Sequence, residues 1–432
     1  MKVSVNPSKI VGFVKPMNAV NNGPVYIKNE DQNLTNLHLY KEAGIPYART
    51  HDASICYDYG GEHTVDIISI FPNFDADPYS PDSYDFDLTD MYIDNIELGG
   101  AQVFYRLGNK IEHWSKHYGI LPPKDFKKWA VICEHIIRHM NEGWANGHHR
   151  NIVYWEIWNE PDLTGKCWDG TAEEFFDLFE ITAKHLKSCF SNIKIGGPAV
   201  SGYNPDWLIP FFEEIKKRDV PMDFYSWHKY TSKIDRLIKD VHLHRALLDK
   251  YGYTECESIL NEWNYVCGWS GEEWKKSLET ELSMKGAAFV SAAMTACQHE
   301  KLDMLMYYDA RINSSMNGLF RPGTFETLKS YYPIKSWSEM LLLGEECETV
   351  CDVPDIYVVS SVKNGEHITM LTYYTDDENA LPRTFKVSIP VEKLHTLYLL
   401  DNGHDMTPHE SIAPDNGEFT LTMNPNTVVV IK

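Results

Sequence analysis

The sequence predicts an α/β protein, a (β/α)8 TIM barrel followed by a C-terminal antiparallel β-sandwich domain. Two patterns lead to this prediction. From residue 8 to about 344, short apolar runs alternate with amphipathic stretches of helical period. After residue 344, strand-like runs follow one another with turn signals between them. We therefore expect a barrel over residues 1–344 and a β-sandwich over 345–432, which some of the first dozen residues join.

Eight apolar runs have the length and composition of buried strands. They are residues 9–17, 46–52, 101–108, 152–160, 193–200, 223–230, 258–265 and 303–310. Amphipathic stretches separate these runs, and parallel strands need crossover helices of this kind. Eight such units match a closed barrel. An open doubly wound sheet is the alternative, which the lack of a GxGxxG motif after the first run disfavours.

The clearest helical pattern is TAEEFFDLFEITAKHLKSCF, residues 171–190. Thr171 and Glu174 have the spacing of a capping box, which marks a helix start. One apolar stripe then recurs at helical period: Phe175, Leu178, Phe179, Ala183, Leu186 and Phe190. This stripe predicts a helix that packs against the barrel.

The C-terminal part begins with a hairpin signal. In DIYVVSSVKNGEHITMLTYYT, Asn364–Gly365 lies between two strand-like runs, and Asn-Gly favours a tight turn. The runs TFKVSIPV, TLYLLDNG, EFTLTMN and TVVVIK follow. No low-complexity linker separates this part from the barrel, so we expect the two to pack firmly.

Composition narrows the classes of partner. The 432 residues carry a formal net charge of −22, and the longest basic cluster is KDFKKW at 124–129, so no nucleic-acid partner is expected. No run approaches 18 apolar residues, so we expect no membrane span and no membrane partner. Aromatic residues make up 13% of the chain, which suits stacking on sugars as well as a large core.

Cysteine and histidine patterns bear on location and cofactors. Nine cysteines occur without a CxxC pair, and the N-terminal sequence MKVSVNPSKIVGF lacks the apolar segment of a signal peptide. Together these features predict a cytoplasmic protein. His148–His149, and His242 with His244, lack the spacing of a metal set, so we expect no metal and no cofactor. Assembly into a homo-oligomer is left open.

Two acidic residues end strand-like runs of the barrel. The stretch YWEIWNEPD places Glu160 at the end of the fourth run, where Pro161 stops the strand. The stretch SILNEWNY places Glu262 near the end of the seventh run. Because the carboxyl ends of barrel strands surround one mouth, we expect the two side chains to converge. One protonated and one ionised carboxyl group can together hydrolyse a glycosidic bond. Trp155 and Trp158 would supply apolar walls if their rings turn toward Glu160.

Several motifs carry a resemblance to a known family. WEIWNEP resembles the acid/base motif of clan A glycoside hydrolases, in which Asn-Glu-Pro ends the fourth strand, and ILNEWN is similar to that clan's nucleophile strand. With RTHD, PPKDFKKW, KIGGPAV and SWHKY at matching places, the chain most resembles glycoside hydrolase family 39, which includes β-xylosidases and α-L-iduronidases. The resemblance covers most of residues 1–344, and the predicted sandwich fits that family too.

The resemblance implies a retaining mechanism. Glu160 would be the general acid/base, Glu262 the nucleophile, and Asn159 would bind the sugar 2-hydroxyl. Six further residues would bind or position the substrate: Arg49, His51, Asp52, His228, Tyr230 and Tyr308. Among these, Tyr230 would keep Glu262 ionised through a hydrogen bond, and Arg49 would order the same carboxylate electrostatically.

The chain also departs from the β-xylosidases of that family. Tyr308 stands where we expect a tryptophan, and it would lie under the sugar in the −1 position. Asp52 follows His51 where a glycine is expected, and the third strand carries Arg106 and Asn109. These departures put the preference for xylose in doubt and leave the barrel chemistry intact.

The function predicted from these features is retaining exo-hydrolysis of small oligosaccharides, most similar to that of a β-xylosidase. Exo action is favoured because residues 53–102 are long enough to wall off one end of the site. The alternatives are an α-L-arabinosidase or another β-glycosidase of the clan, an endo-glycanase, and a catalytically inactive glycan-binding protein.

Overall fold

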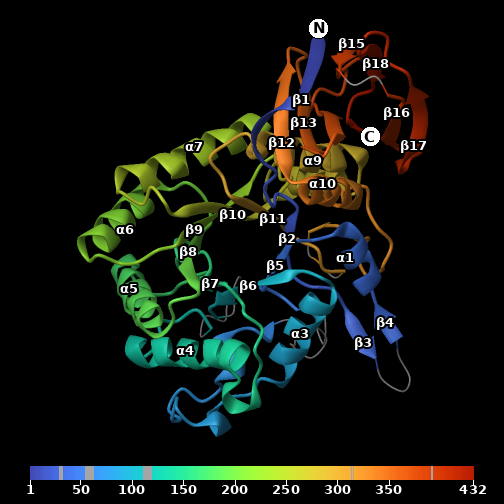
Figure 1. The fold of residues 1–432 in the computed structure, drawn as a ribbon. Helices are drawn as coiled ribbons and strands as arrows, with labels where there is room; N and C mark the ends of the chain where they lie inside the picture. The colour runs from blue at the N-terminus through green and yellow to red at the C-terminus, as the bar shows by residue number, and fades with distance from the viewer. Residues whose placement is uncertain (29–32, 54–62, 110–118, 313, 315, 391–392) are drawn as a thin grey trace.

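The computed structural model describes residues 1–28, 33–53, 63–109, 119–312, 314, 316–390 and 393–432. Figure 1 shows a barrel surrounded by helices and, beside it, a large sheet that carries both chain termini. Within the described residues, no helix is both long and apolar enough to cross a membrane.

Eight parallel strands close the barrel, which confirms the predicted fold class. In barrel order they are β10 (Glu257–Asn264), β11 (Met304–Tyr307), β2 (Ala19–Asn21), β5 (Tyr47–Arg49), β6 (Gln102–Leu107), β7 (Tyr154–Ile157), β8 (Lys194–Val200) and β9 (Phe224–Tyr230). A buried apolar cluster that includes Phe104, Tyr154 and Phe224 fills the barrel toward the amino ends of the strands. Polar groups inside the barrel therefore lie toward the carboxyl ends.

Helices cover the outside of the barrel (Figure 1). They are α1 (Leu37–Ala43), α2 (Ile67–Ile70), α3 (Asp87–Leu98), α4 (Phe126–Glu142), α5 (Ala172–Cys189), α6 (Pro205–Lys217), α7 (Ile234–Lys250), α8 (Gly271–Glu281), α9 (Met284–Gln298) and α10 (Tyr331–Leu343). The capping box predicted for α5 is confirmed. The backbone N–H of Glu174 donates to Oγ1 of Thr171 at 3.1 Å, and the N–H of Thr171 donates to the Glu174 carboxylate at 2.8 Å.

The prediction of residues 9–17 as the first barrel strand was wrong. Residues up to Phe13 belong to β1 (Lys2–Phe13), which pairs with β12 (Glu345–Cys351) in the large sheet. Phe13 is 74% exposed there, whereas a barrel strand is covered on both faces. The first barrel strand is the short β2, which ends in the polar residue Asn21 and follows the polar residue Asn18. Both residues are buried, and their polarity hides this strand from a search for apolar runs.

The large sheet has nine strands in the order β17-β16-β19-β14-β13-β12-β1-β15-β18. Besides β1 and β12, its strands are β13 (Ile356–Lys363), β14 (Glu366–Tyr373), β15 (Arg383–Ser388), β16 (His395–Leu400), β17 (Asp405–Ile412), β18 (Glu418–Met423) and β19 (Thr427–Ile431). Pairing is antiparallel except between β1 and β15. The predicted hairpin is confirmed, because Lys363 pairs with Glu366 around Asn364–Gly365. The sheet curls around its own core, in which side chains of strands from both edges meet. The domain boundary at 344/345 stays a prediction.

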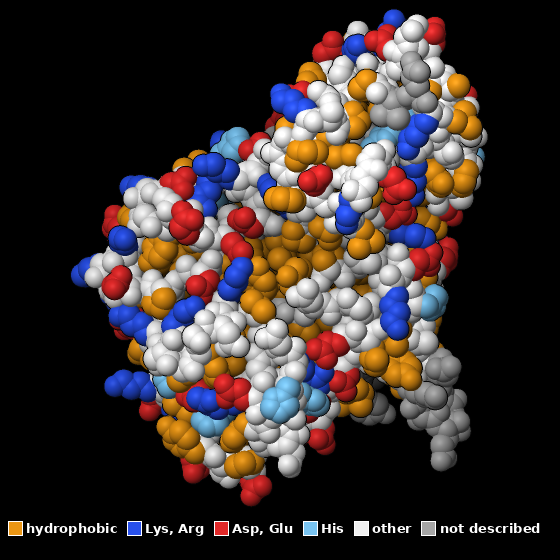
Figure 2. Space-filling view, viewed as in Figure 1, with side chains coloured by type: hydrophobic (Ala, Val, Ile, Leu, Met, Phe, Trp, Pro, Cys, Tyr) orange, Lys and Arg blue, Asp and Glu red, His pale blue; other side chains and the backbone are white. Residues whose placement is uncertain are grey.

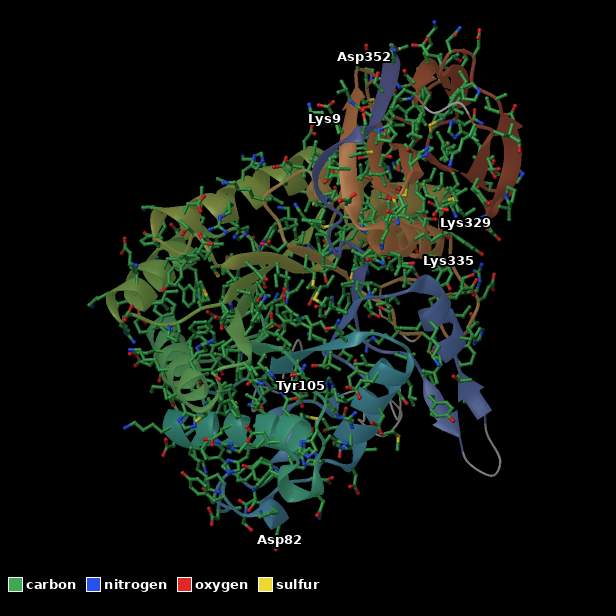
Figure 3. The ribbon with its side chains drawn as sticks, in the orientation of Figure 1. Lys9, Asp82, Tyr105, Lys329, Lys335 and Asp352 are labelled. Atoms are coloured by element: carbon green, nitrogen blue, oxygen red, sulfur yellow. The ribbon has the colours of Figure 1, made fainter. Side chains whose placement is uncertain are left out.

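The sheet packs on the barrel through α9 and α10 (Figure 1). Side chains of β13, β14 and β19 join the barrel's main apolar core. Polar contacts add to this interface: the hydroxyls of Ser291 and Thr372 lie 2.5 Å apart, and Nζ of Lys285 lies 2.7 Å from Oδ1 of Asp376. Lys329, labelled in Figure 3, reaches Asp405 at 2.6 Å. On the face shown in Figure 2, acidic and basic side chains are interspersed, and hydrophobic side chains gather in the middle, over the barrel.

Candidate active site

The two predicted carboxylates converge at the carboxyl ends of the barrel strands. Glu160 follows β7, and Glu262 lies near the end of β10. An oxygen of Glu160 and an oxygen of Glu262 lie within 4.8 Å of one another. Only 9% of Glu160 and 8% of Glu262 is exposed, so both carboxyl groups are largely removed from water.

The backbone is distorted at both positions. The register between β9 and β10 shifts between Leu260 and Glu262, which marks an irregularity in the ladder. Side chains alternate along a regular strand, and a bulge lets neighbours such as Asn261 and Glu262 both contact groups inside the barrel. Trp158 and Glu160 have φ angles of 73° and 48°, in the left-handed region that residues other than glycine seldom adopt. Such strain persists where the surroundings impose it, often at functional sites.

Arg49, at the end of β5, connects the groups of the site. Its Nε donates to Glu156 at 2.7 Å, and its terminal nitrogens donate to Asn159 at 2.6 Å, to Asn21 at 3.0 Å and to Glu262 at 3.2 Å. The guanidinium is fully buried, and its planar fork of donors matches several acceptors at once. Arg49 thus fixes both the Glu262 carboxylate and the amide of Asn159.

The amide of Asn159 is held in one orientation. Its Oδ1 accepts from Arg49, while its Nδ2 is buried without a hydrogen-bond partner among the described residues. A buried donor without a partner costs free energy unless a ligand or water accepts from it. The free N–H groups of Asn159 are therefore available to a hydroxyl of a bound molecule.

Glu156 is a buried charge that the sequence analysis did not single out. It lies in the middle of β7 with no exposed surface, and its carboxylate accepts from Arg49, from Oγ of Ser226 at 2.6 Å and from Nδ2 of Asn261. The signal that could have found it is a glutamate inside an otherwise apolar barrel strand, because such a residue is almost always paired when buried.

Breaking this buried pair is expected to destabilise the barrel. The Glu156→Gln variant keeps the shape of the side chain but removes the closer of the two carboxylates that pair with Arg49, so the free energy of unfolding should fall by about 3 kcal/mol. Urea denaturation followed by tryptophan fluorescence measures this change. The control is Glu142→Gln, which removes an exposed partner of Arg138 and should change stability by less than about 0.5 kcal/mol. Equal effects of the two variants would contradict the structural role of Glu156.

Three groups surround the Glu262 carboxylate. The Tyr230 hydroxyl donates to Oε1 at 2.5 Å, while Arg49 and Nδ1 of His228 lie 3.2 and 3.6 Å from Oε2. Burial raises the pKa of Glu262, and the nearby Glu160 charge adds to the rise. Arg49 and the Tyr230 hydrogen bond act in the opposite direction, because they favour the ionised form. These contacts suit a carboxylate that must be ionised to act.

Removing the Tyr230 hydroxyl is expected to shift the pH dependence of activity. In Tyr230→Phe the ionised form of Glu262 loses a hydrogen bond, so the pKa of Glu262 rises. The acid limb of the kcat/KM profile should then move to higher pH, and kcat/KM on that limb should fall by about tenfold. Steady-state kinetics across the acid range measure the shift. A limb that stays in place would show that this hydrogen bond does not control Glu262.

Glu160 contacts a different set of groups. Nδ1 of His228 lies 2.8 Å from its Oε1, and the Cys167 thiol donates to its Oε2 at 3.6 Å. Burial lowers the pKa of His228, so the imidazole is neutral at neutral pH. A neutral imidazole donates or accepts at Nδ1 according to its tautomer. Nε2 of His228 has no hydrogen-bond partner among the described residues, so no other contact selects the tautomer. Nδ1 can therefore accept from protonated Glu160 or donate to ionised Glu160.

Of the two tryptophans expected to wall Glu160, only Trp158 contacts a described residue that touches it. Trp155 stacks on Tyr105, which is labelled in Figure 3, with ring centroids 4.8 Å apart. Its indole N–H donates to the carbonyl of Ile152, so the ring packs on Tyr105 and bonds to the backbone rather than to Glu160. Trp158 donates its indole N–H to the carbonyl of Cys167 at 2.8 Å, and the thiol of Cys167 faces Glu160. Trp158 therefore supports the wall beside Glu160 through Cys167.

The remaining predicted residues form a second cluster beside the carboxylates. Oδ2 of Asp52 accepts from the Tyr308 hydroxyl at 3.2 Å and lies 3.1 Å from the Arg311 guanidinium and 3.0 Å from Nδ1 of His51. Burial acts to raise the pKa of Asp52, but the charge of Arg311 and the hydrogen bond from His51 outweigh it and hold this pKa well below its usual range. Burial lowers the pKa of His51 to about 3, so this ring is neutral. Arg311 also donates to Asp309 at 3.0 Å, and these two carboxylates flank its charge.

Comparison with models of known protein families shows to which family the chain belongs. The family model for glycosyl hydrolases family 39 matches residues 2–260. The chain belongs to glycosyl hydrolases family 39. The matched region includes Glu160 and Asn159 and ends two residues before Glu262.

Two β-xylosidases are similar in sequence to this family 39 chain. The enzyme of Geobacillus stearothermophilus is 28% identical over 225 residues, which are 50% of this chain and 42% of that protein. The enzyme of Caldicellulosiruptor saccharolyticus is 28% identical over 243 residues, 54% of this chain and 47% of that protein. The chain thus spans less than half the length of these curated relatives.

Solved structures share the fold over the whole chain. A glucosidase from Croceicoccus marinus superposes with a TM-score of 0.79 at 20% identity, covering 100% of this chain and 98% of that one. A monomeric β-xylosidase from Caulobacter crescentus CB15 superposes with a TM-score of 0.72 at 16% identity, with the same coverage. These similarities support the arrangement of barrel and sheet in this family 39 chain.

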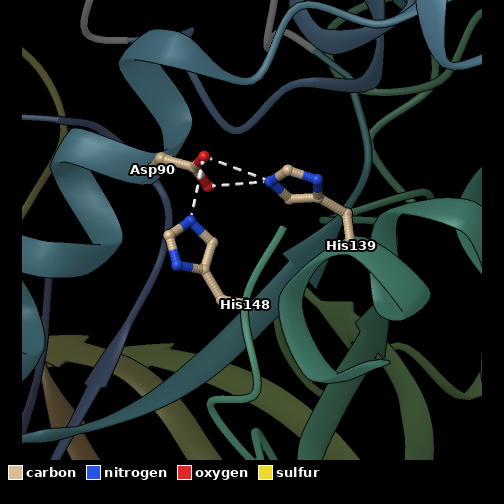
Figure 4. Close-up of side chains that lie close together, drawn as sticks. All are labelled: Asp90, His139 and His148. Carbon is tan, nitrogen blue, oxygen red and sulfur yellow. Dashed lines mark hydrogen bonds and ion pairs between the residues drawn. The ribbon is translucent and has the colours of Figure 1, made fainter. Parts of the chain in front are cut away.

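Three groups of described side chains lie close enough together to hold a metal ion. They are Glu160 with His228 and Glu262, Asp90 with His139 and His148, and Glu134 with His185 and Cys189. In the group drawn in Figure 4, Nε2 of His139 lies 3.1 Å from both oxygens of Asp90, and Nε2 of His148 lies 3.0 Å from one of them. Nδ1 of His139 contacts the carbonyl of Trp144 at 3.0 Å. These contacts account for the cluster drawn in Figure 4, and the expected absence of a metal stays a prediction.

Proposed function

We propose that this chain is a retaining exo-glycosidase that hydrolyses small oligosaccharides, with Glu160 as the general acid/base and Glu262 as the nucleophile. The pair of buried carboxylates with oxygens within 4.8 Å carries the proposal. Carboxyl groups of retaining glycosidases lie roughly 5–5.5 Å apart, and those of inverting enzymes roughly 6.5–9.5 Å apart. The observed spacing therefore supports retention.

The two steps follow from the contacts of each carboxyl group. In the first step, Glu160 gives its proton to the glycosidic oxygen as the bond from this oxygen to the anomeric carbon breaks. Glu262 attacks that carbon, forming a glycosyl ester, and the leaving alcohol departs. In the second step, Glu160 takes a proton from water, whose oxygen attacks the anomeric carbon and releases Glu262. Asn159 would donate to the sugar 2-hydroxyl, because its Nδ2 lacks a partner among the residues that the structure describes.

The sugar that we propose is a β-xyloside. Two curated relatives named β-xylosidase support it, although the matched segments cover less than half of each. Exo action is supported by the salt bridge between Asp52 and Arg311, which lies against Tyr308 and would close one end of the site. An α-L-arabinoside or another β-glycoside is the alternative, since Tyr308 replaces the tryptophan expected at the −1 position. Cytoplasmic location and assembly into a homo-oligomer stay predictions.

A panel of 4-nitrophenyl glycosides tests the substrate. We expect the β-xyloside to give the highest kcat/KM, and an α-L-arabinoside or β-glucoside in first place would replace the proposed sugar. A xylo-hexasaccharide then tests the mode of attack. Release of monosaccharide alone supports exo action, whereas early internal cuts would show an endo-glycanase. No turnover of any glycoside would leave the glycan-binding alternative.

A further inference from the structure

A tryptophan at the mouth of the barrel has no role in the chemistry above. Trp269 lies in the connection from β10, which carries Glu262, to α8. Its side chain is 61% exposed, and it is the one tryptophan that counts as exposed in the part of the chain that the structure describes. Single exposed aromatic rings are common on protein surfaces, so the position of this ring, just after the strand that carries Glu262, is what points to a role.

Two aromatic rings hold Trp269 in position. Trp274 of α8 stacks on it, with centroids 5.5 Å apart and an interplanar angle of 22°. Tyr230 meets it edge to face, with centroids 4.9 Å apart and an angle of 75°. The 61% exposure shows that these contacts leave most of the side chain open. The ring is therefore a supported, solvent-facing surface.

This surface lies next to the reacting groups. Tyr230 joins the two, because its hydroxyl donates to Glu262 at 2.5 Å while its ring contacts Trp269. The side chains proposed to hold the −1 sugar, by contrast, are buried: Arg49, His51, Asp52, Asn159 and Tyr308 are each at most 9% exposed. The exposed ring of Trp269 therefore lies at the solvent side of the buried −1 pocket. In an exo-acting enzyme, the leaving group would extend toward this side.

We propose that Trp269 forms the platform on which the leaving-group sugar ring stacks. This inference rests on the proposed glycosidase function and deepens it. The ligand is a neutral sugar ring, whose C–H groups carry partial positive charge and meet the negative face of the indole. Trp274 and Tyr230 fix the indole in advance, so little conformational freedom is lost when the sugar binds.

Acceptor-dependent release of a trapped intermediate tests this role. The enzyme is first labelled with an activated 2-deoxy-2-fluoro glycoside of the best substrate sugar, and excess reagent is removed. Recovery of activity is then measured in buffer and with increasing concentrations of a disaccharide acceptor, which must bind in the leaving-group position. We expect the ratio of acceptor-dependent to water-dependent recovery to fall by about tenfold in Trp269→Ala and to be largely retained in Trp269→Phe.

The control is Phe13→Ala, which removes an aromatic ring that is 74% exposed on β1 of the large sheet and should leave the ratio as in the wild type. An unchanged ratio in Trp269→Ala, when the wild type is labelled normally, would overturn the platform alone. A wild-type enzyme that forms no glycosyl adduct would overturn the proposed function and the platform together. A change of oligomeric state in Trp269→Ala with an unchanged ratio would assign the ring to an interface between copies instead.

Discussion

The Glu262→Ala variant is expected to hydrolyse 4-nitrophenyl glycosides at least about 10⁴-fold more slowly than the wild type, because it lacks the carboxylate that we propose as the nucleophile. The fold should survive, since Glu262 accepts from Arg49 and Tyr230 but Arg49 keeps its buried partner Glu156. Initial rates with matched enzyme concentrations measure the loss. Glu279→Ala, a change at an exposed position of α8, is the control and should keep wild-type activity.

Chemical rescue makes this prediction specific to the nucleophile. Azide is small enough to occupy the space of the missing carboxylate, and its attack from that side should give a glycosyl azide of inverted configuration with an activated substrate. A residual rate within about tenfold of the wild type would contradict the assignment of Glu262. A glycosyl azide of retained configuration would assign Glu262 to the opposite face of the sugar.

The Glu160→Ala variant should show a loss that depends on the leaving group. For a substrate with a poor leaving group, such as a disaccharide, kcat/KM should fall by about 10²–10⁴-fold, because protonation of the departing oxygen is lost. A 2,4-dinitrophenyl glycoside needs little protonation, so its bond to the sugar should still break and the glycosyl-enzyme should accumulate. Pre-steady-state kinetics would detect this as a burst of dinitrophenolate followed by a slow steady state.

The pH profile gives a second test of Glu160. The fall of kcat/KM at high pH reports loss of the catalytic proton, so Glu160→Ala should lack this limb. The matched control is Glu173→Ala, an exposed change in the first turn of α5 that should keep the full profile. Equal losses for good and poor leaving groups, or an intact high-pH limb, would contradict the acid/base role.

Much of the fold could be predicted because barrel strands and helices leave different periodicities in the sequence. The convergence of Glu160 and Glu262 followed from one rule, that the carboxyl ends of parallel strands meet at one mouth. The first barrel strand was missed because a hydrophobic pattern detects only apolar residues. The strand β2 is held in the barrel by hydrogen bonds of the Asn21 side chain as well as by burial.

Other features of the site depend on contacts between distant residues. Arg49 and Glu156 are 107 positions apart in the sequence, and Asp52 and Tyr308 are 256 apart. Contacts between such distant residues cannot be predicted from one sequence alone. The irregularity before Glu262 is also absent from the residue pattern, yet it lets adjacent side chains face the same interior. The support of Trp269 by Tyr230 likewise appears only when β9 and the loop after β10 are placed together.

The central claim is that Glu262 forms a covalent bond to the sugar while Glu160 supplies and recovers the proton. Labelling with a 2-deoxy-2-fluoro glycoside, followed by proteolysis and mass spectrometry of the modified peptide, tests it most directly. The account predicts one glycosyl adduct on the peptide that contains Glu262. An adduct on Glu160, or active turnover with no adduct on either residue, would contradict it.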